Sequence, residues 1–200
     1  NRNHEAPPDY AVELAKLLNA TIKKGGNLVI PAFSVGRTQE MLYFLRRIKS
    51  ENLLPEFPDF EVYVDSPLSV EATSIFNKNV ADCFNDDARV LIEQGINPIR
   101  FEGLKVSVTS DDSKMINYDP KPKVIISASG MCEAGRIRHH LKHNLWRADS
   151  TILFVGYQVP GTLGFSLLNG VKKVKLFGEE IDVKADIVNL PGISGHADMD

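Results

Sequence analysis

Two patterns of apolar and polar positions alternate along this chain. Short runs typical of strands lie at 27–33, 60–65, 103–110, 122–129 and 150–157, and the nearly continuous apolar stretches VIISA and ILFVG in the last two are typical of strands buried on both faces. Stretches with apolar residues three or four positions apart, typical of helices with one buried side, lie at 7–26, 38–49, 69–76, 85–95, 133–145 and 161–170. Strands that alternate with helices predict an α/β domain, a mostly parallel sheet with helices on both faces.

The tail of the chain follows a different pattern. Segments 173–177 and 181–188 alternate apolar and polar residues, with Gly178 between them. Such alternation is typical of a half-exposed β-hairpin and not of a parallel strand. We therefore expect residues 1–170 to form the α/β domain and residues 171–200 to be a partial segment of a neighbouring domain. The chain begins with Asn, and we expect it to be part of a longer protein.

Composition excludes several classes of protein. With 43% hydrophobic and 24% charged residues the chain has an ordinary globular balance, which argues against a disordered or fibrous protein. No apolar run approaches the roughly 18 residues of a membrane-spanning helix. The two cysteines, Cys83 and Cys132, give no disulfide framework and no CxxC pair, so we expect a reducing, cytoplasmic setting.

The net charge of −3 hides two segments of opposite sign. Residues 51–93 carry ten acidic and two basic side chains, whereas residues 114–147 carry seven basic and two acidic ones. This asymmetry is compatible with one face that accepts polyanions. It is equally compatible with two solvated helical surfaces of opposite charge.

Small and hydroxyl residues gather where the predicted strands end. Segments 31–40, 64–69, 127–136 and 155–162 follow four strands, and ligands of open parallel sheets bind beyond such carboxyl ends. The small and polar residues there are Ser34, Gly36, Ser66, Ser69, Ser127, Ser129, Gly130, Gly156, Gly161 and Thr162. Helix amino termini beside them can hold phosphates, and Arg37 and Arg136 could add bidentate contacts. The alternative is that the serines cap helices and the glycines make tight turns.

The histidines point to different roles. His139 and His143 share one helical face, but no acidic residue stands where an HExxH helix needs one, so we favour a solvated or phosphate-facing position over metal ligation. His196 lies in a glycine-rich loop with Asp198 two residues on, a setting suited to proton transfer. Cys132 has no neighbouring base to activate it as a nucleophile.

Five segments together resemble the β-CASP ribonucleases of the metallo-β-lactamase superfamily, bacterial or archaeal type. In order along the chain they are GGNLVIPAFSVGRTQEMLYFL, VYVDSPLS, VIISASGMCEAGRIRHHLKH, ILFVGYQVPGTLG and SGHAD. The family includes the cleavage-and-polyadenylation endonuclease and ribonuclease J. The resemblance implies a β-CASP domain inserted into a metallo-β-lactamase domain, to which the C-terminal hairpin segment would belong.

The resemblance also implies an activity. Family members hydrolyse RNA phosphodiesters, as endonucleases, 5′ exonucleases or both, in RNA processing or degradation, with two zinc ions held mainly by an HxHxDH loop of the lactamase domain. That loop is absent from this sequence. The family's first acidic motif would precede Asn1 and its last histidine motif would follow Asp200. We therefore expect the full-length parent to be a zinc-dependent ribonuclease, and this segment alone to hold no catalytic zinc and to cleave nothing.

The family's second motif, Ser-x-His-x-Asp, reads here as Ser194 to Asp198. By resemblance His196 is the general acid near the scissile phosphate, and Ser194 donates to a phosphate oxygen. The other residues that resemble the family's RNA path are Ser34, Arg37, Ser66, Ser127, Ser129, Gly130 and Arg136. Gly161 and Thr162 fall in a turn that the resemblance places at an interface.

Three other functions stay open. The parent could be a non-catalytic RNA-binding paralogue that has lost its zinc ligands, or a β-CASP nuclease that acts on DNA. Without the resemblance, a doubly wound domain that binds a phosphorylated metabolite would fit the loops, although the hairpin tail and SGHAD fit it poorly. The expected partners are RNA and the lactamase domain of the same chain; a homodimer is compatible with the sequence.

Overall fold

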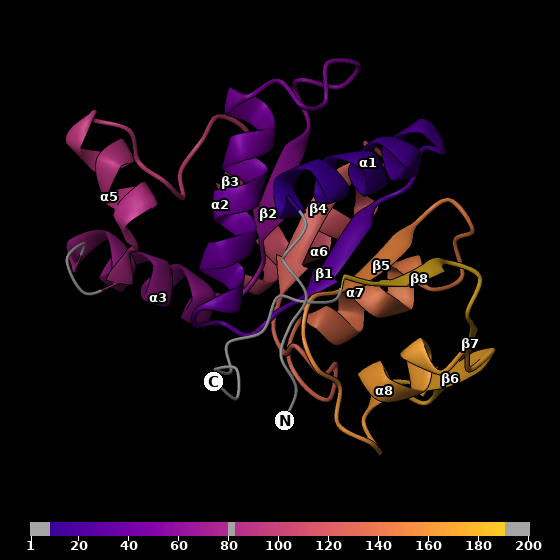
Figure 1. The fold of residues 1–200 in the computed structure, drawn as a ribbon. Coiled ribbons are helices and arrows are strands. Elements are labelled where there is room, and N and C mark those ends of the chain that lie inside the picture. Colours follow the sequence, from indigo (N-terminus) through magenta and orange to yellow (C-terminus); the bar gives the residue numbers. More distant parts are fainter. Residues whose placement is uncertain (1–8, 80–82, 191–200) are drawn as a thin grey trace, which may run out of the picture.

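The computed structural model describes residues 9–79 and 83–190. Its helices are α1 (Tyr10–Lys23), α2 (Arg37–Ser50), α3 (Pro67–Lys78), α5 (Asp86–Glu93), α6 (Ser110–Tyr118), α7 (Ile137–Asn144) and α8 (Leu163–Leu168). Its strands are β1 (Leu28–Pro31), β2 (Glu61–Val64), β3 (Leu104–Val106), β4 (Lys123–Ser127), β5 (Thr151–Phe154), β6 (Lys173–Leu176), β7 (Glu179–Asp182) and β8 (Asp186–Asn189). Figure 1 shows helices packed on both sides of the central sheet. The predicted fold class is confirmed.

The central sheet has six strands in the order β3-β2-β4-β1-β5-β8. All five pairings in it are parallel, so the carboxyl ends of its strands meet at one edge. Alternate residues of each strand face opposite sides of the sheet. On β1, Leu28 and Ile30 join the apolar core under α1 and α2, whereas Val29 joins the core that includes residues of α7 and α8. Burial on both faces accounts for the near-continuous apolar runs of the sequence.

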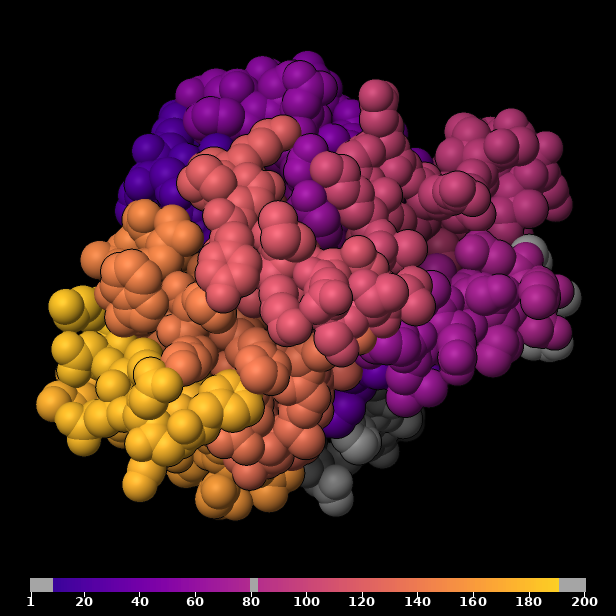
Figure 2. Space-filling view, turned by 180° about the vertical axis from the view of Figure 1, so that it is seen from behind, coloured from indigo at the N-terminus to yellow at the C-terminus, as the bar shows by residue number. Residues whose placement is uncertain are grey.

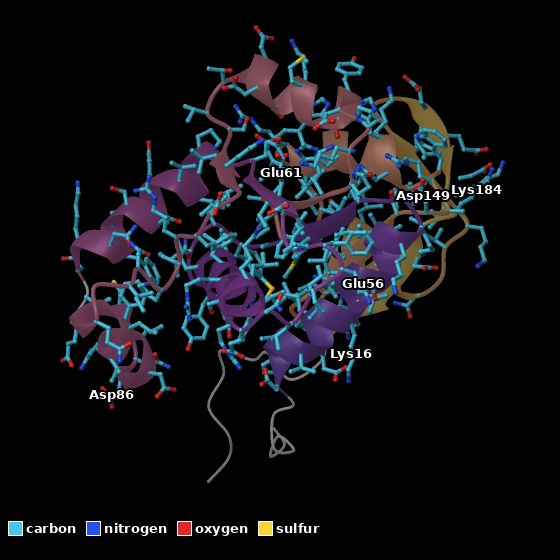
Figure 3. All side chains as sticks on the ribbon, turned by 90° about the horizontal axis from the view of Figure 1, so that it is seen from above. Lys16, Glu56, Glu61, Asp86, Asp149 and Lys184 are labelled. Atoms are coloured by element: carbon cyan, nitrogen blue, oxygen red, sulfur yellow. The ribbon has the colours of Figure 1, made fainter. Side chains whose placement is uncertain are left out.

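The acidic segment that contains α3 and α5 projects from the rest of the molecule, as Figures 1 and 2 both show. Ala88 is the one residue of α5 that is buried, so the helix has a small apolar contact with the domain. Charged side chains such as Lys16, Asp86 and Lys184 lie at the periphery (Figure 3). The charged side chains of this segment are thus largely exposed to solvent.

Several helix bounds differ from the prediction, and one helix was not predicted; α7, for example, begins at Ile137 and not at residue 133. Helix α3 begins at Pro67 and not at Ser69, because Ser66 is its N-cap and Pro is favourable in a first turn. Helix α6 lies where the apolar pattern predicts no helix. It begins with a reciprocal cap in which the Thr109 hydroxyl accepts from Asp112 N and the Asp112 carboxylate accepts from Thr109 N, each at 3.1 Å.

The C-terminal part combines a confirmed hairpin with one corrected strand. Strands β6 and β7 pair antiparallel across a tight turn at Phe177 and Gly178, which both have positive φ as a two-residue hairpin turn requires. The expected single strand 181–188 is wrong, because the N–H groups of Lys184 and Ala185 donate to Leu145 O and break it. Its second half, β8, pairs parallel to β5 at the edge of the central sheet. The assignment of residues 171–200 to a second domain stays a prediction.

Candidate nucleic-acid interface

The loops that the sequence singles out all leave the same edge of the sheet. They follow β1, β2, β4 and β5, which end at Pro31, Val64, Ser127 and Phe154 and lie next to one another. Because these strands are parallel, their carboxyl ends and the loops after them gather on one side. The topology thus brings together residues that are far apart in the sequence.

Direct contacts join these loops. The hydroxyl oxygens of Ser34 and Ser66 lie 3.4 Å apart, and Gln158 Nε2 donates to Gly130 O at 3.0 Å. Gly130 also packs so closely on Phe33 that a Cβ at that position would stand 3.2 Å from the ring. A side chain at Gly130 would therefore push the loop after β4 away from the loop after β1.

Besides the contact between Ser34 and Ser66, the predicted serines have further hydrogen bonds within the chain. Ser66 Oγ accepts from Ser69 N at 3.2 Å as the cap of α3. Ser127 is buried and its hydroxyl donates to Asp65 O at 2.8 Å, while the hydroxyl of Ser129 donates to Ala134 O at 3.3 Å. Ser34 is half-buried at the edge. The capping role thus holds for Ser66, and contact of any of these serines with RNA stays a prediction.

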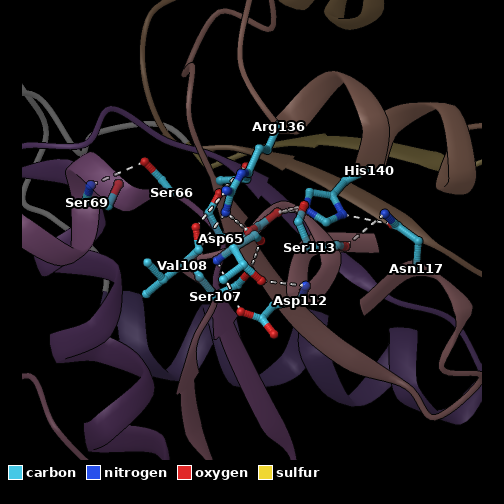
Figure 4. Close-up of polar contacts among 12 residues, drawn as sticks. Asp65, Ser66, Ser69, Ser107, Val108, Asp112, Ser113, Asn117, Arg136 and His140 are labelled. Carbon is cyan, nitrogen blue, oxygen red and sulfur yellow. Dashed lines mark hydrogen bonds and ion pairs between the residues drawn. The ribbon is translucent and has the colours of Figure 1, made fainter. Parts of the chain in front are cut away.

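A buried carboxylate lies at the centre of this edge. Asp65, immediately after β2, is fully buried and binds groups from three other segments (Figure 4). Its Oδ2 lies 2.6 Å from both His140 Nε2 and Ser113 Oγ, and its Oδ1 accepts from Arg136 at 2.8 Å. One carboxylate therefore ties together α6, α7 and the loop after β4.

The partners of Asp65 keep it ionised despite burial. Burial by itself raises the pKa of a carboxyl group. Hydrogen bonds from His140, Ser113 and Ser107, together with the charge of His140, outweigh that effect and lower the pKa of Asp65 to about 2. The second ring nitrogen of His140 lies 2.8 Å from Asn117 Oδ1, so both sides of this buried ring are hydrogen-bonded.

The two predicted arginines lie in different surroundings. Arg136 donates to Asp65, to Ser107 O at 3.3 Å and to Val108 O at 2.8 Å, so its guanidinium holds the loop after β3 against the loop after β4. Arg37 is the first residue of α2, its side chain is 16% exposed, and it forms an ion pair with Glu40. Arg136 is primarily a structural link, and phosphate binding by either arginine stays a prediction.

The histidines of α7 have separate roles. His139 stacks on Phe177 with ring centroids 4.3 Å apart, and His143 meets the edge of Tyr118 at 5.9 Å. Burial lowers the pKa of both rings. His140, between them, is the fully buried one, and the sequence pattern gives no sign of its role. In residues 9–79 and 83–190 no group of three or more His, Cys, Asp or Glu side chains is arranged to hold a metal ion.

Two predicted residues, Ser194 and His196, lie outside the described residues. Gly161 has φ +92°, and Thr162 caps α8 by accepting from Phe165 N at 3.2 Å. Both therefore serve the turn before α8, and the placement of this turn at an interface stays a prediction. No helix of the described ranges has the length and apolar character that crossing a membrane requires.

Comparison with known proteins agrees with the architecture. The model of the Beta-Casp domain matches residues 38–167. Ribonuclease TTHA0252 of Thermus thermophilus is 36% identical over the whole chain, which corresponds to 45% of that protein. The transcription termination factor FttA of Methanosarcina mazei is 32% identical over 99% of this chain and 31% of its own length.

An RNase J-like protein of Methanocaldococcus jannaschii is 30% identical over 93% of the chain and 41% of its own length. The chain thus spans less than half the length of each of these relatives. The family model covers more than half of the chain, and the matched region contains Asp65, Arg136 and His140. This chain belongs to the β-CASP domain family.

Proposed function

We propose that this chain is the β-CASP portion of a metallo-β-lactamase-fold ribonuclease, a hydrolase that cuts RNA phosphodiesters in RNA processing or degradation. The observation that carries the proposal is the single sheet edge at which the loops after β1, β2, β4 and β5 contact one another. The names of the similar proteins, two of them ribonucleases or RNase J-like, support RNA as the substrate. We expect the protein to work in the cytoplasm, and its two cysteines are both unpaired.

The proposed zinc centre does not fit the residues that the structure describes, since none of them form a cluster suited to a metal ion. We therefore assign the metal ligands to the lactamase domain of the full-length chain. In this arrangement the lactamase domain holds the metal ions, and the present segment contributes RNA contacts and one proton donor. His196 would protonate the leaving 3′-oxygen and Ser194 would donate to a phosphate oxygen.

Metal analysis tests whether the metal ligands lie outside this segment. The purified full-length protein is expected to hold about two zinc ions per chain, as a two-metal phosphodiesterase does. Segment 1–200, produced alone, is expected to hold none. Two tightly bound zinc ions on the segment would contradict the proposal, and a metal-free full-length protein would favour the non-catalytic alternative.

The salt dependence of RNA binding tests whether Arg37 contacts a phosphate group of the RNA. Replacing it by Ala in the full-length protein is expected to weaken binding of single-stranded RNA and to reduce the slope of log K against log salt concentration by about 0.7, the value for one lost phosphate contact. Arg147→Ala is a matched control, because Arg147 is also ion-paired, to Asp149, and precedes β5 at the opposite edge of the sheet. An unchanged slope in Arg37→Ala would rule out the phosphate contact.

The relatives named as transcription termination factors favour a second, narrower role for the full-length protein, in which its RNA substrate is a nascent transcript. Cleavage of RNA that emerges from a stalled transcription complex, compared with the same RNA free in solution, would test that role. A preference for duplex or single-stranded DNA over RNA would instead support the DNA-directed alternative.

A further inference from the structure

A cavity of about 620 Å³ opens beside the candidate RNA edge, between α2 and the projecting α3–α5 segment. Five aromatic rings line it: Phe33, Tyr43, Phe44, Phe76 and Phe84. Phe33 belongs to the loop after β1, is 48% exposed and contacts Gly130 of the loop after β4. The cavity is therefore continuous with the edge at which the candidate substrate loops meet.

The cavity wall is aromatic but not purely apolar. Glu40 lines it and is ion-paired with Arg37, and burial raises the pKa of this carboxyl group against the opposing effect of Arg37. Gln39 lines it too; its Nε2 donates to Ser34 O and Thr73 Oγ1, and its Oε1 is buried without a partner among the described residues. The half-exposed carboxylate of Glu40 is therefore an oxygen acceptor within a frame of rings, beside the guanidinium of Arg37, which also lines the cavity.

A wall of aromatic rings that also carries a carboxylate favours some classes of ligand over others. Among the charged lining residues Arg37 attracts a phosphate group and Glu40 repels one, so the cavity does not favour the charged backbone of a nucleic acid by its net charge. An apolar peptide segment would cover the Arg37–Glu40 ion pair and remove it from water without new hydrogen bonds, which is costly. A nucleobase fits both features of the wall, because its faces stack on aromatic rings and its exocyclic amino group can donate to the carboxylate of Glu40.

We propose that this cavity is a base-binding subsite that takes one unstacked nucleobase of the bound RNA, with a preference for bases that carry an exocyclic amino group. The inference rests on the proposed function, since it assigns a further contact of the same substrate. The base enters between α2 and α5, and its phosphate remains at the sheet edge near the start of α2. The preference follows from the acceptors: cytosine presents an amino group where uracil presents an oxygen.

Removing one base of the RNA at a time tests the subsite without any protein variant. Binding to the full-length protein is measured with single-stranded oligoribonucleotides that carry cleavage-resistant phosphorothioate linkages and one abasic nucleotide at each position in turn. One position is expected to weaken binding about 5- to 150-fold, the range for loss of one base–aromatic stack. At that position cytosine should bind more tightly than uracil.

Variants then locate the subsite. Phe33→Leu and Phe84→Leu keep apolar volume but remove a ring. In these variants an abasic nucleotide at the sensitive position should cost much less affinity than in wild type. At the other positions the loss of affinity should be the same as in wild type. Glu40→Gln should reduce the preference for cytosine over uracil. Tyr118→Leu is the control, because Tyr118 is 69% exposed on α6, across the sheet from α2.

The outcomes separate the two proposals. If the complete oligonucleotide does not bind the wild-type protein, the proposed function fails. If it binds but an abasic nucleotide weakens binding at no position, the subsite is refuted and the proposed function survives. The same holds if the loss of affinity at the sensitive position is as large in both Leu variants as in wild type. A cytosine preference that is equal in wild type and Glu40→Gln would refute the role of the carboxylate.

Discussion

Turnover of RNA by the full-length protein is expected to fall about 100-fold or more when His196 is replaced by Ala, which is the usual contribution of a general acid. The leaving 3′-oxygen of a cleaved phosphodiester must acquire a proton, and an imidazolium in the Ser-Gly-His-Ala-Asp segment is suited to supply it. Affinity for RNA should change little, because the proton is needed in the transition state and not for binding. The measurement is single-turnover cleavage of a defined RNA, with binding measured in parallel.

His139→Ala is the matched control for that experiment. His139 lies in the same half of the chain, and its ring is engaged in a stack on Phe177. The His139→Ala variant should turn over RNA at the wild-type rate. The decline of turnover at alkaline pH, where a general acid loses its proton, should disappear in His196→Ala. Wild-type cleavage by the His196→Ala variant would remove His196 from the mechanism.

The second large effect concerns stability. Asp65→Asn is expected to lower the free energy of unfolding by about 3–5 kcal/mol, because it removes the buried charge that Arg136 and His140 bind. The loss should be concentrated in α7 and in the loop after β4, which Asp65 holds. Urea unfolding gives the overall change, and hydrogen exchange of peptides from residues 128–144 in the full-length protein shows where protection is lost.

Glu61→Gln provides the matched control on the same strand. The pKa of Glu61 is also lowered to about 2, with the hydrogen bond from Lys105 as the largest cause, but its side chain is part-exposed and its partners are surface lysines. Such pairs contribute about 0–1 kcal/mol. If the two variants lose equal stability, the special role of Asp65 is wrong.

The lowered pKa of Asp65 also sets a pH dependence. A carboxyl group with a pKa of about 2 in the folded state and 3.8 as its ordinary value stabilises the fold above about pH 4. That contribution, roughly 2 kcal/mol, is lost as the pH falls from about 4 to about 2. The thermal unfolding midpoint of wild type should drop more steeply over this range than that of Asp65→Asn. Parallel curves would contradict the assignment.

Much of the architecture could be predicted from local pattern. The strand runs at 27–33 and 122–129 are mostly apolar because both faces of the central strands are covered. Helix α6 could not be predicted from the spacing of apolar residues, because it is short and mostly polar. Its capping box, formed by Thr109 and Asp112, is the one local signal of a helix there. Strand β8 cannot be separated from β7 by sequence, because the bonds that divide them go to Leu145, some 40 residues earlier.

The candidate edge could be predicted only in part. The order of strands and helices implied that loops rich in Ser and Gly would gather at one edge, and the described residues confirm that placement. The hydrogen bonds of those residues could not be predicted. Ser127 and Arg136 had the chemistry of phosphate ligands, and in the fold both are bonded to Asp65, one to its carbonyl oxygen and the other to its carboxylate.

By itself, then, the sequence determined the fold class, the family and the segment that carries His196, because periodicity, capping residues and motif spacing are properties of neighbouring positions. Tertiary structure alone decided that Asp65 and His140 form a buried pair across 75 positions and that five rings from distant parts of the chain line one open cavity beside the candidate RNA edge. Such features depend on which distant side chains lose contact with water together, and burial is set by the packing of the whole chain and not by any local run of residues.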